Sequence, residues 1–185
     1  MPTIIWVIIV VAALIIFWLI GVYNSLIKLR NQTDEAWSDI DVQLKRRYDL
    51  IPNLIETVKG YAKHEEGVLT KVTELRAKMQ GASGSMAEMS AIKNEMTSTL
   101  KSLFAVAENY PNLKADSSFL QLQTQLSDLE TEIQKSRRYY NATVQEYNTK
   151  IQVFPNVLIA GIMKFTPAEF FAAADEEKEN VKVEF

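Results

Sequence analysis

The chain has 185 residues, of which 48% are hydrophobic and 23% are charged, a composition typical of a folded protein. It contains no cysteine and one histidine, which excludes disulfides, thiolate zinc sites, cysteine nucleophiles and metal sites made of three histidines from one chain. The net charge of -3 gives no indication of nucleic-acid binding. We therefore expect one core, no cofactor and no nucleic-acid partner.

The first predicted element is a membrane span. Residues Ile4 to Tyr23 carry no charge, and as a helix they would extend about 30 Å, the thickness of the hydrocarbon core of a bilayer. No Lys or Arg precedes this segment and no small-x-small cleavage site follows it, so we expect a retained single-pass anchor rather than a cleaved signal peptide. The lipid bilayer is the predicted partner of this segment.

The basic residues after the span predict its orientation. Lys28 and Arg30 follow Tyr23 closely, whereas no basic side chain precedes the span. Because short cytoplasmic flanks are enriched in Lys and Arg, we expect the N-terminus outside and the rest of the chain in the cytoplasm of a bacterial cell. An external or periplasmic location of the helical domain is the alternative.

Beyond the anchor, apolar residues recur at helical spacing in four runs, and strands have no comparable signal. The runs are Leu26, Leu29, Thr33, Ala36, Ile40, Leu44, Ile51, Ile55, Val58 and Tyr61; Val68, Val72, Leu75 and Met79; Met86, Met89, Ile92, Met96, Leu103 and Ala107; and Leu122, Leu126, Leu129, Ile133, Tyr140, Val144, Tyr147 and Ile151. The last run is close to a heptad, which is typical of coiled-coil packing, and we expect Leu126, Leu129 and Ile133 to form its central seam.

None of these helices can bury its apolar face alone, and their connections are short. The sequence therefore predicts an all-α fold, in which an N-terminal single transmembrane helix (residues 1–23) is followed by an antiparallel up-and-down helical bundle of three long helices plus short helical pieces (24–171) and an acidic C-terminal tail (172–185). We expect the methionines of the third run to fill the core, although an adaptable binding surface is the alternative.

Several residues predict where helices break or begin. Gly81 and Gly84 in "QGASGS" indicate a flexible turn, and Asp116, Ser117 or Ser118 can cap the helix that follows Pro111. Pro52 predicts either a kink or a restart of the helix with Asp49 as its cap. After Pro155, the apolar side chains of Phe154, Val157, Leu158, Ile162 and Phe165 are expected to cover the open end of the bundle.

Charged and polar residues in two stretches are the candidate interaction or structural site. They are Arg46, Arg47, Asp49, Pro52, Asn53, His64, Glu65, Arg137, Arg138 and Tyr139. The arginines are expected to pair with acidic residues of other helices, with an anion or partner site as the alternative. His64 is expected on a solvated helix face, because "HEEG" lacks the second histidine of a zinc-binding helix pair. No metal or cofactor site is predicted.

Four motifs in this order resemble those of the LemA family of bacterial membrane proteins. They are "RRYDLIPNLIETVKGYAKHE", "YPNLKADSSFLQLQTQLSDLETEI", "SRRYYNATVQEYN" and "FPNVLIAGIMKF". The resemblance extends from the anchor to Phe171 and implies a single span and a helical-bundle domain. It supplies no catalytic residues, and it points to envelope or membrane-protein quality control. Relatives often have Phe-Gly-Phe where this chain has Met163-Lys164-Phe165, so Lys164 argues against an obligatory glycine conformation there.

Three function classes fit the sequence. A membrane-anchored scaffold that presents a protein-interaction surface to a membrane protein is the main hypothesis, since no catalytic constellation is found. A membrane-surface or lipid-organising protein that uses "NVLIAGIMKF" as an interfacial segment is the first alternative. An enzyme that uses Asp49, Glu56, His64 and Glu65 as acid and base is the second. Self-association into a homo-oligomer, through bundle faces or the span, is also expected.

Overall fold

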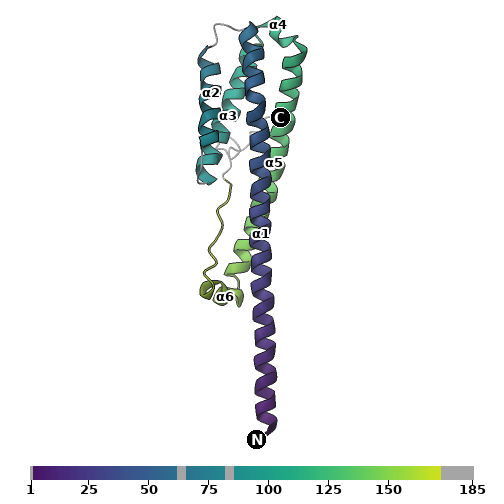
Figure 1. Ribbon diagram of the computed structural model, residues 1–185, viewed down its shortest axis with the longest axis vertical. Helices are drawn as coiled ribbons and strands as arrows, with labels where there is room; N and C mark the ends of the chain where they lie inside the picture. Colours follow the sequence, from purple (N-terminus) through teal and green to yellow (C-terminus); the bar gives the residue numbers. More distant parts are fainter. Residues whose placement is uncertain (1, 62–65, 82–85, 172–185) are drawn as a thin grey trace, which may run out of the picture. The chain divides into compact units, whose positions relative to one another are not determined.

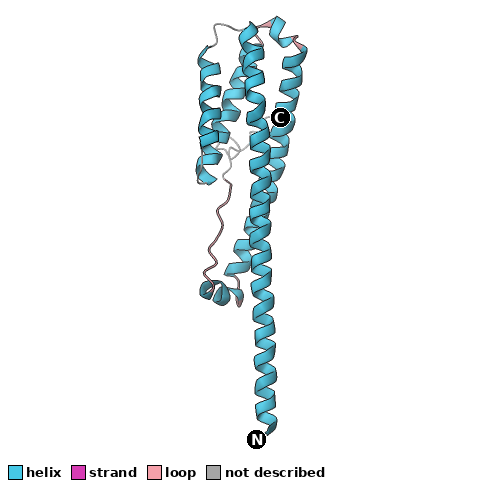
Figure 2. Ribbon diagram, in the orientation of Figure 1, coloured by secondary structure: helices cyan, strands magenta, loops and turns pink. Residues whose placement is uncertain are grey.

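The computed structural model describes residues 2–61, 66–81 and 86–171, and all regular structure among them is helical (Figure 2). The helices are α1 (Pro2–Tyr61), α2 (Glu66–Gly81), α3 (Met86–Ala107), α4 (Pro111–Lys114), α5 (Ser117–Gln152) and α6 (Asn156–Ile162) (Figure 1). The predicted all-α class is confirmed. Gly84 of the predicted turn and the predicted acidic tail lie outside the described residues, and the boundaries of the three predicted segments stay a prediction.

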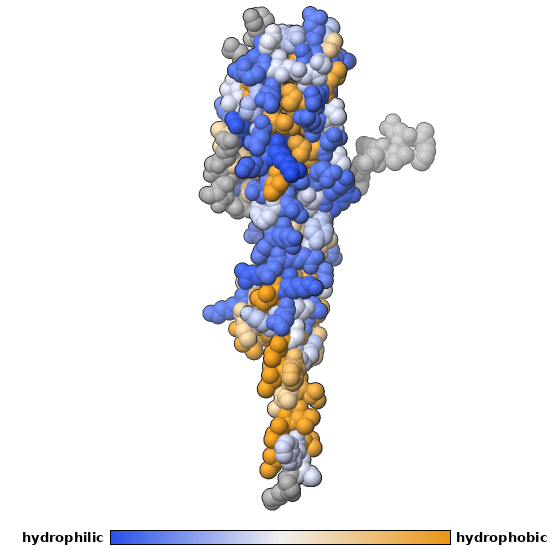
Figure 3. Space-filling view, turned by 45° about the vertical axis from the view of Figure 1, so that its right-hand side comes forward, coloured by the Kyte–Doolittle hydropathy of each residue, from blue (hydrophilic) through white to orange (hydrophobic). Residues whose placement is uncertain are grey.

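The predicted anchor and the first helix of the domain form one helix, α1. None of the apolar window at its N-terminal end is buried within the chain, and Figure 3 shows the hydrophobic surface along this part. Among the described helices, α1 alone is long and apolar enough to cross a bilayer. The length and composition of residues Ile4 to Tyr23 thus make them a candidate membrane span.

Of the two outcomes predicted at Pro52, a kink or a restart of the helix, the restart is wrong, because α1 continues through this residue to Tyr61. The kink stays a prediction. A proline inside a helix removes one backbone hydrogen bond and costs about 3 kcal/mol. The neighbouring side chains of Ile51, Leu54 and Ile55 are all buried, so the packing of this part of α1 offsets that cost.

The predicted cap of the long helix α5 is confirmed for Asp116. The backbone N–H of Phe119 donates to Asp116 Oδ1 at 3.0 Å, and the hydroxyl of Tyr61 donates to Asp116 Oδ2 at 3.0 Å. These two hydrogen bonds lower the pKa of Asp116, because they stabilise its charged form. Asp116 therefore fixes the start of α5 and the end of α1 with one carboxylate.

The contacts between residues group the chain into two compact units. Unit 1 joins the residues up to Ser38 with Arg138–Phe170, and unit 2 joins Asp39–Arg137 with Phe171. Unit 1 thus contains the candidate span, the second part of α5 and α6. Unit 2 contains the second part of α1, then α2, α3 and α4, and the first part of α5.

The core of unit 2 is made of apolar side chains from α1, α2, α3 and α5. Fully buried members include Ile40, Leu44, Ile51 and Leu54 on α1, Leu75 on α2, Met96 and Leu103 on α3, and Ile133 on α5. Met96 therefore fills the core as expected, whereas Met89 is half-buried. The predicted seam of α5 needs one correction: Leu126 and Ile133 are buried, but Leu129 is only half-buried.

The core of unit 1 surrounds the end of the candidate span. It is formed by Val22, Leu26, Leu29, Tyr147, Ile151, Ile159 and Ala160, with Phe165 and Ala168 packed against it. The prediction that the apolar segment after α5 covers the bundle end is wrong for four of its five side chains. Phe154, Val157, Leu158 and Ile162 are exposed, because α6 turns Ile159 and Ala160 toward the core instead.

Lys164 adopts the left-handed conformation that the sequence argued against, with φ at 56°. The reason lies in how α6 ends. The N–H of Phe165 donates to the carbonyl of Ala160 at 2.9 Å and that of Lys164 donates to the carbonyl of Gly161 at 3.3 Å. This pair of bonds is a Schellman motif, which requires a left-handed residue at the position of Lys164.

Candidate functional site

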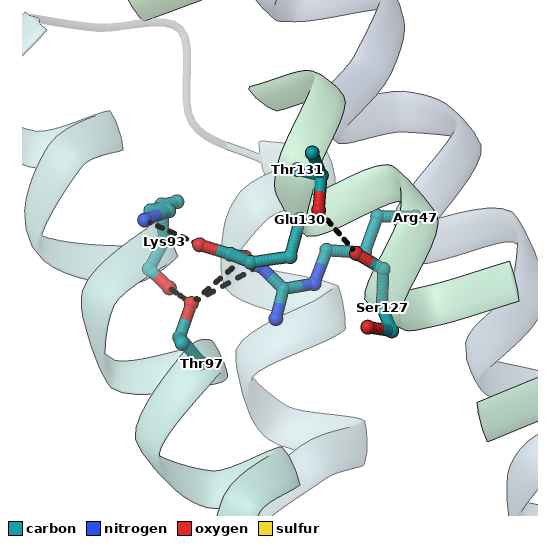
Figure 4. A network of polar contacts seen from close by, with 6 residues as sticks. All are labelled: Arg47, Lys93, Thr97, Ser127, Glu130 and Thr131. Carbon is teal, nitrogen blue, oxygen red and sulfur yellow. Dashed lines mark hydrogen bonds and ion pairs between the residues drawn. The ribbon is translucent and has the colours of Figure 1, made fainter. Parts of the chain in front are cut away.

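Unit 2 contains a network of charged residues from three helices. Arg47 on α1 and Lys93 on α3 both point at Glu130 on α5 (Figure 4). Arg47 Nη1 lies 2.6 Å from Glu130 Oε2, and Lys93 Nζ lies 3.1 Å from Glu130 Oε1. Each carboxylate oxygen therefore holds its own cation.

The two cations of the network are removed from water almost completely. The side chains of Arg47 and Lys93 are 4% and 2% exposed, whereas that of Glu130 is 20% exposed. Burial lowers the pKa of Arg47 and of Lys93, and the charge of Glu130 acts against this shift in both cases. Glu130 thus provides the counter-charge that stabilises the two buried cations.

Thr97 on α3 completes the network. It accepts a hydrogen bond from Arg47 Nη1 at 3.0 Å and donates one to the carbonyl of Lys93 at 3.0 Å. A groove of about 390 Å³ lies beside Arg47, Thr97 and Glu130, with Phe104 and Gln123 also in its wall. The network connects α1, α3 and α5, because both carboxylate oxygens of Glu130 are paired with cations of the other two helices.

A second groove in unit 2 has the composition of a binding surface. Its volume is about 320 Å³, and its lining residues are Asp41, Leu44, Lys45, Tyr48, Asp49, Met79 and Met89. Hereafter it is called the Tyr48 groove. Methionine and tyrosine are enriched where proteins bind partners, because methionine adapts its shape and tyrosine offers an apolar ring with a polar end. Asp41, Lys45 and Asp49 are exposed, so they form a charged rim.

The hydroxyl group of Tyr48 has no hydrogen-bond partner among the described residues, although the side chain is 4% exposed. Burial raises the pKa of this phenol well above its ordinary value of 10, since the charged form is disfavoured away from water. A buried hydroxyl without a partner costs about 1–3 kcal/mol, so native structures contain few of them. Because the Tyr48 side chain also lines the groove, the groove is a candidate binding site.

The structure separates the candidate residues of the first stretch. Arg46 is exposed, while Arg47 is buried and pairs with a glutamate of another helix, as expected for the arginines. Asp49 lies at the rim of the Tyr48 groove. Pro52 is half-buried inside α1, and Asn53 is exposed. His64 and Glu65 of the same stretch lie outside the described residues. Of the five described candidates, Arg47 belongs to the charged network and Asp49 to the rim of the Tyr48 groove.

The candidates of the second stretch serve different contacts. Arg137 is buried and lies 5.0 Å from the ring centre of Phe171, in a cation–π contact. Arg138 is exposed, and the hydroxyl of Tyr139 accepts a hydrogen bond from Gln32 at 3.1 Å. The second stretch is therefore not gathered into one site.

The carboxylates proposed for acid and base catalysis do not converge where the structure describes them. Asp49 and Glu56 are both exposed and are separated by two turns of α1, about 10 Å. Glu56 lies 3.8 Å from Lys59 of the same helix. Among the described residues, no group of three or more acidic or histidine side chains is placed to hold a metal ion.

Sequence reasoning missed Lys93, Thr97, Glu130 and Tyr48. A signal for two of them was present in the spacing: Glu130 lies four residues after Leu126 and three before Ile133, on the apolar stripe of α5. Lys93 has the corresponding position in α3, four residues after Met89 and three before Met96. A charged residue on an apolar stripe indicates a buried partner, and that indication would have found the network.

Comparison with known proteins gives concordant similarities. The model of the LemA family matches residues 36–185. The chain is 28% identical over 165 residues to Protein LemA of Metamycoplasma hominis, and this alignment covers 89% of the chain and 75% of that protein. It is 25% identical to magnetosome protein MamQ 2 of Paramagnetospirillum magneticum and 22% identical to magnetosome protein MamQ of Magnetospirillum gryphiswaldense. The chain covers 64% of the length of each of these two magnetosome proteins.

Proposed function

Because the chain belongs to the LemA family, whose members are membrane-associated, we propose that it is a membrane-anchored helical scaffold that binds a protein partner in the Tyr48 groove. The observation that carries the proposal is the buried hydroxyl of Tyr48, which lines the groove and has no hydrogen-bond partner among the described residues. A carbonyl or carboxylate of a partner would satisfy this hydroxyl and recover about 1 kcal/mol or more.

The lining of the groove indicates the chemistry of the partner. Met79 and Met89 are flexible side chains, so they can move to admit an apolar side chain and expose the hydroxyl beside them. The rim carries two aspartates and one lysine, Asp41, Asp49 and Lys45. A short segment that places a basic residue next to an apolar anchor residue complements this surface.

The proposal includes the place of the protein in the cell. The span from Ile4 to Tyr23 would hold the scaffold at the bilayer, with the helical domain on the cytoplasmic side because of Lys28 and Arg30. A role in envelope or membrane-protein quality control is consistent with a partner that is itself a membrane protein. Protease added to intact spheroplasts tests the orientation, since digestion of the domain without lysis contradicts a cytoplasmic location.

Self-association is a separate part of the proposal. A near-heptad stripe on α5 and confinement to a membrane both favour a homo-oligomer. Light scattering of the full-length protein in detergent measures it directly. Monomers at every concentration would contradict self-association and leave the groove proposal untouched.

Site-specific photocrosslinking in native membranes tests the groove. A photoreactive amino acid replaces Lys45 or Asp49 at the rim, and the matched control replaces Arg46, which is exposed on the same helix but does not line the groove. We expect the two rim positions to capture the same membrane protein and the control to capture none of it. Equal capture at all three positions, or none at the rim, would contradict the proposal.

A further inference from the structure

Helix α6 and the residues beside it keep large apolar side chains at the surface. Phe154, Leu158 and Ile162 are 80%, 59% and 76% exposed, and Val157 and Met163 are exposed as well. On the other side of α6, Ile159 and Ala160 are buried in the core of unit 1. A helix that is apolar on nearly all sides is normally enclosed by protein or by lipid. We therefore expect the outer face of α6 to be covered and not to face water.

The inner face of α6 packs against α1 near the end of the candidate span. Ile159 and Ala160 pack with Val22, Leu26 and Leu29 of α1 in one cluster. Figure 1 shows α6 beside α1. The ring of Phe165, three residues after α6, meets the ring of Tyr23 edge-on with 6.0 Å between centroids. α6 is thus fixed against the last residues of the candidate span.

The depth of this contact matches the edge of a bilayer. From Val22 to Leu29, α1 rises about 10 Å along its axis. A bilayer of about 40–45 Å with a hydrocarbon core of about 30 Å leaves about 5–8 Å of headgroup region on each side. If Tyr23 marks the end of the hydrocarbon core, the α1 residues that pack with α6 extend from that boundary to about 9 Å outward, which is the level of the headgroup region.

Two basic residues lie near the C-terminal end of α6. Lys164 follows α6 and is exposed, and it lines one pocket together with Arg30. Asp34 is the acidic residue in the pocket of Arg30 and Lys164. Basic residues beside an apolar face are typical of helices that lie in a membrane interface.

We propose that the segment 153–163 is a second membrane contact, an interfacial element that inserts Phe154, Leu158, Ile162 and Met163 into the leaflet beside the end of the span. The occupant of the exposed face is the lipid bilayer. Unit 1 thus contacts the membrane at two places: the span crosses the bilayer, and α6 lies along its surface. This element is independent of the Tyr48 groove, which belongs to unit 2.

Because the chain has no cysteine, single-cysteine variants of the full-length protein can be labelled cleanly. Leu158→Cys and Ile162→Cys are labelled with an environment-sensitive fluorophore and reconstituted into vesicles of neutral and anionic phospholipids. Ala142→Cys, exposed on α5 about 14 Å along the helix from Ile151, is the water-exposed control. Leu14→Cys, inside the span, is the control for deep burial in lipid.

Quenchers in the lipid and in the water read out the surroundings of each label. We expect lipids with a spin label near the carbonyl end of the acyl chain to quench the labels at 158 and 162 several-fold more than the label at 142, and iodide to quench them less. Labels at 158 and 162 that iodide reaches as well as it reaches 142 would overturn the proposal. Labels shielded from iodide but not quenched by lipid would also overturn it, since a protein would then cover the face. Circular dichroism checks that each variant is folded, which is expected because both side chains are exposed.

Discussion

In unit 2 the interior holds two cations, Arg47 and Lys93, around the carboxylate of Glu130, whereas the cluster around Leu26 in unit 1 holds aliphatic side chains and one tyrosine ring. That ring belongs to Tyr147, and its hydroxyl donates to the carbonyl of Thr166 at 3.1 Å. A charged network is directional and tolerates one arrangement of its helices, while apolar packing is non-directional and can continue into lipid. The difference fits a scaffold that needs defined geometry in one unit and membrane contact in the other.

The largest expected effect comes from breaking the charged network. Glu130→Ala leaves Arg47 and Lys93 buried without a counter-charge, so we expect the free energy of unfolding to fall by about 3–5 kcal/mol. Urea unfolding of the full-length protein in detergent, followed by circular dichroism, measures this. The control replaces all three residues by apolar ones of similar volume (Arg47→Met, Lys93→Met and Glu130→Leu) and should be close to the wild type or more stable. A small loss for Glu130→Ala would show that the network does not hold the helices.

The second prediction separates apolar core positions from the border of the core. Ile133→Ala removes a side chain that is 0% exposed, and we expect a loss of about 2–5 kcal/mol through the transfer and cavity terms. Leu129→Ala, on the same helix, should cost about 1 kcal/mol, because Leu129 is only half-buried. The same unfolding measurement compares the two variants. Equal losses of unfolding free energy would show that Leu129 is as much a core residue as Ile133.

The third prediction concerns the response of unit 1 to alkaline pH. The hydroxyl of Tyr140 donates to the carbonyl of Glu169 at 2.8 Å, and burial raises the pKa of this phenol from 10.0 to about 12. A pKa that is higher in the folded state contributes stability that is complete below pH 10 and is lost as the pH rises to about 12. Because solvent screens part of this effect, we expect a loss of about 1–2 kcal/mol.

Tyr140→Phe provides the test of this pH dependence. The free energy of unfolding of the wild type minus that of Tyr140→Phe should shrink between pH 10 and about 12 and stay constant at neutral pH. A difference that does not change with pH would mean that the phenol ionises equally well in the folded state. Tyr48 remains in both proteins, so its own raised pKa cancels in the comparison.

The smallest expected effect is a gain in stability at the end of α6. Lys164 has φ at 56°, a conformation that costs a residue with a side chain about 1 kcal/mol relative to glycine. Lys164→Gly should therefore raise the free energy of unfolding by about 1 kcal/mol, as measured by urea unfolding of the full-length protein. Lys164→Ala is the control that removes the charge but keeps the conformational cost. If Lys164→Ala stabilises as much as Lys164→Gly, the charge and not the backbone is responsible.

Helical spacing was sufficient to predict the fold class, because apolar residues at intervals of three and four mark the buried face of each helix. Asp116, Ser117 and Ser118 were predicted as alternative caps from local sequence alone, and Asp116 is the one that caps α5. The prediction of a restart at Pro52 was wrong, because packing around Ile51 and Leu54 outweighs a local preference. The conformation of Lys164 was also predicted wrongly. The hydrogen bonds of the Schellman motif impose a backbone conformation that the residue type alone disfavours.

The candidate site was less accessible to sequence reasoning, since it depends on which helices are neighbours. Arg47 was singled out, but its partner lies 83 positions away in the sequence, and no local pattern pairs the two. Glu130 and Lys93 interrupt apolar stripes, a signal that predicts burial without predicting the partner. Tyr48 was not singled out, because an unsatisfied hydroxyl is a property of the packed structure.

The most direct test of the Tyr48 groove compares Tyr48→Phe with the wild type in two assays. In the first, urea unfolding of the full-length protein, loss of a buried hydroxyl without a partner should leave the free energy of unfolding unchanged or slightly higher. In the second, affinity for the membrane protein captured from the groove rim, the loss of one hydrogen bond of about 1 kcal/mol should weaken binding about fivefold. Arg46→Ala, which changes an exposed side chain on the same helix outside the groove, serves as the matched control and should bind like the wild type. Weaker binding by a Tyr48→Phe protein of unchanged stability is the predicted result, and unchanged binding would contradict the central claim that this groove holds the partner.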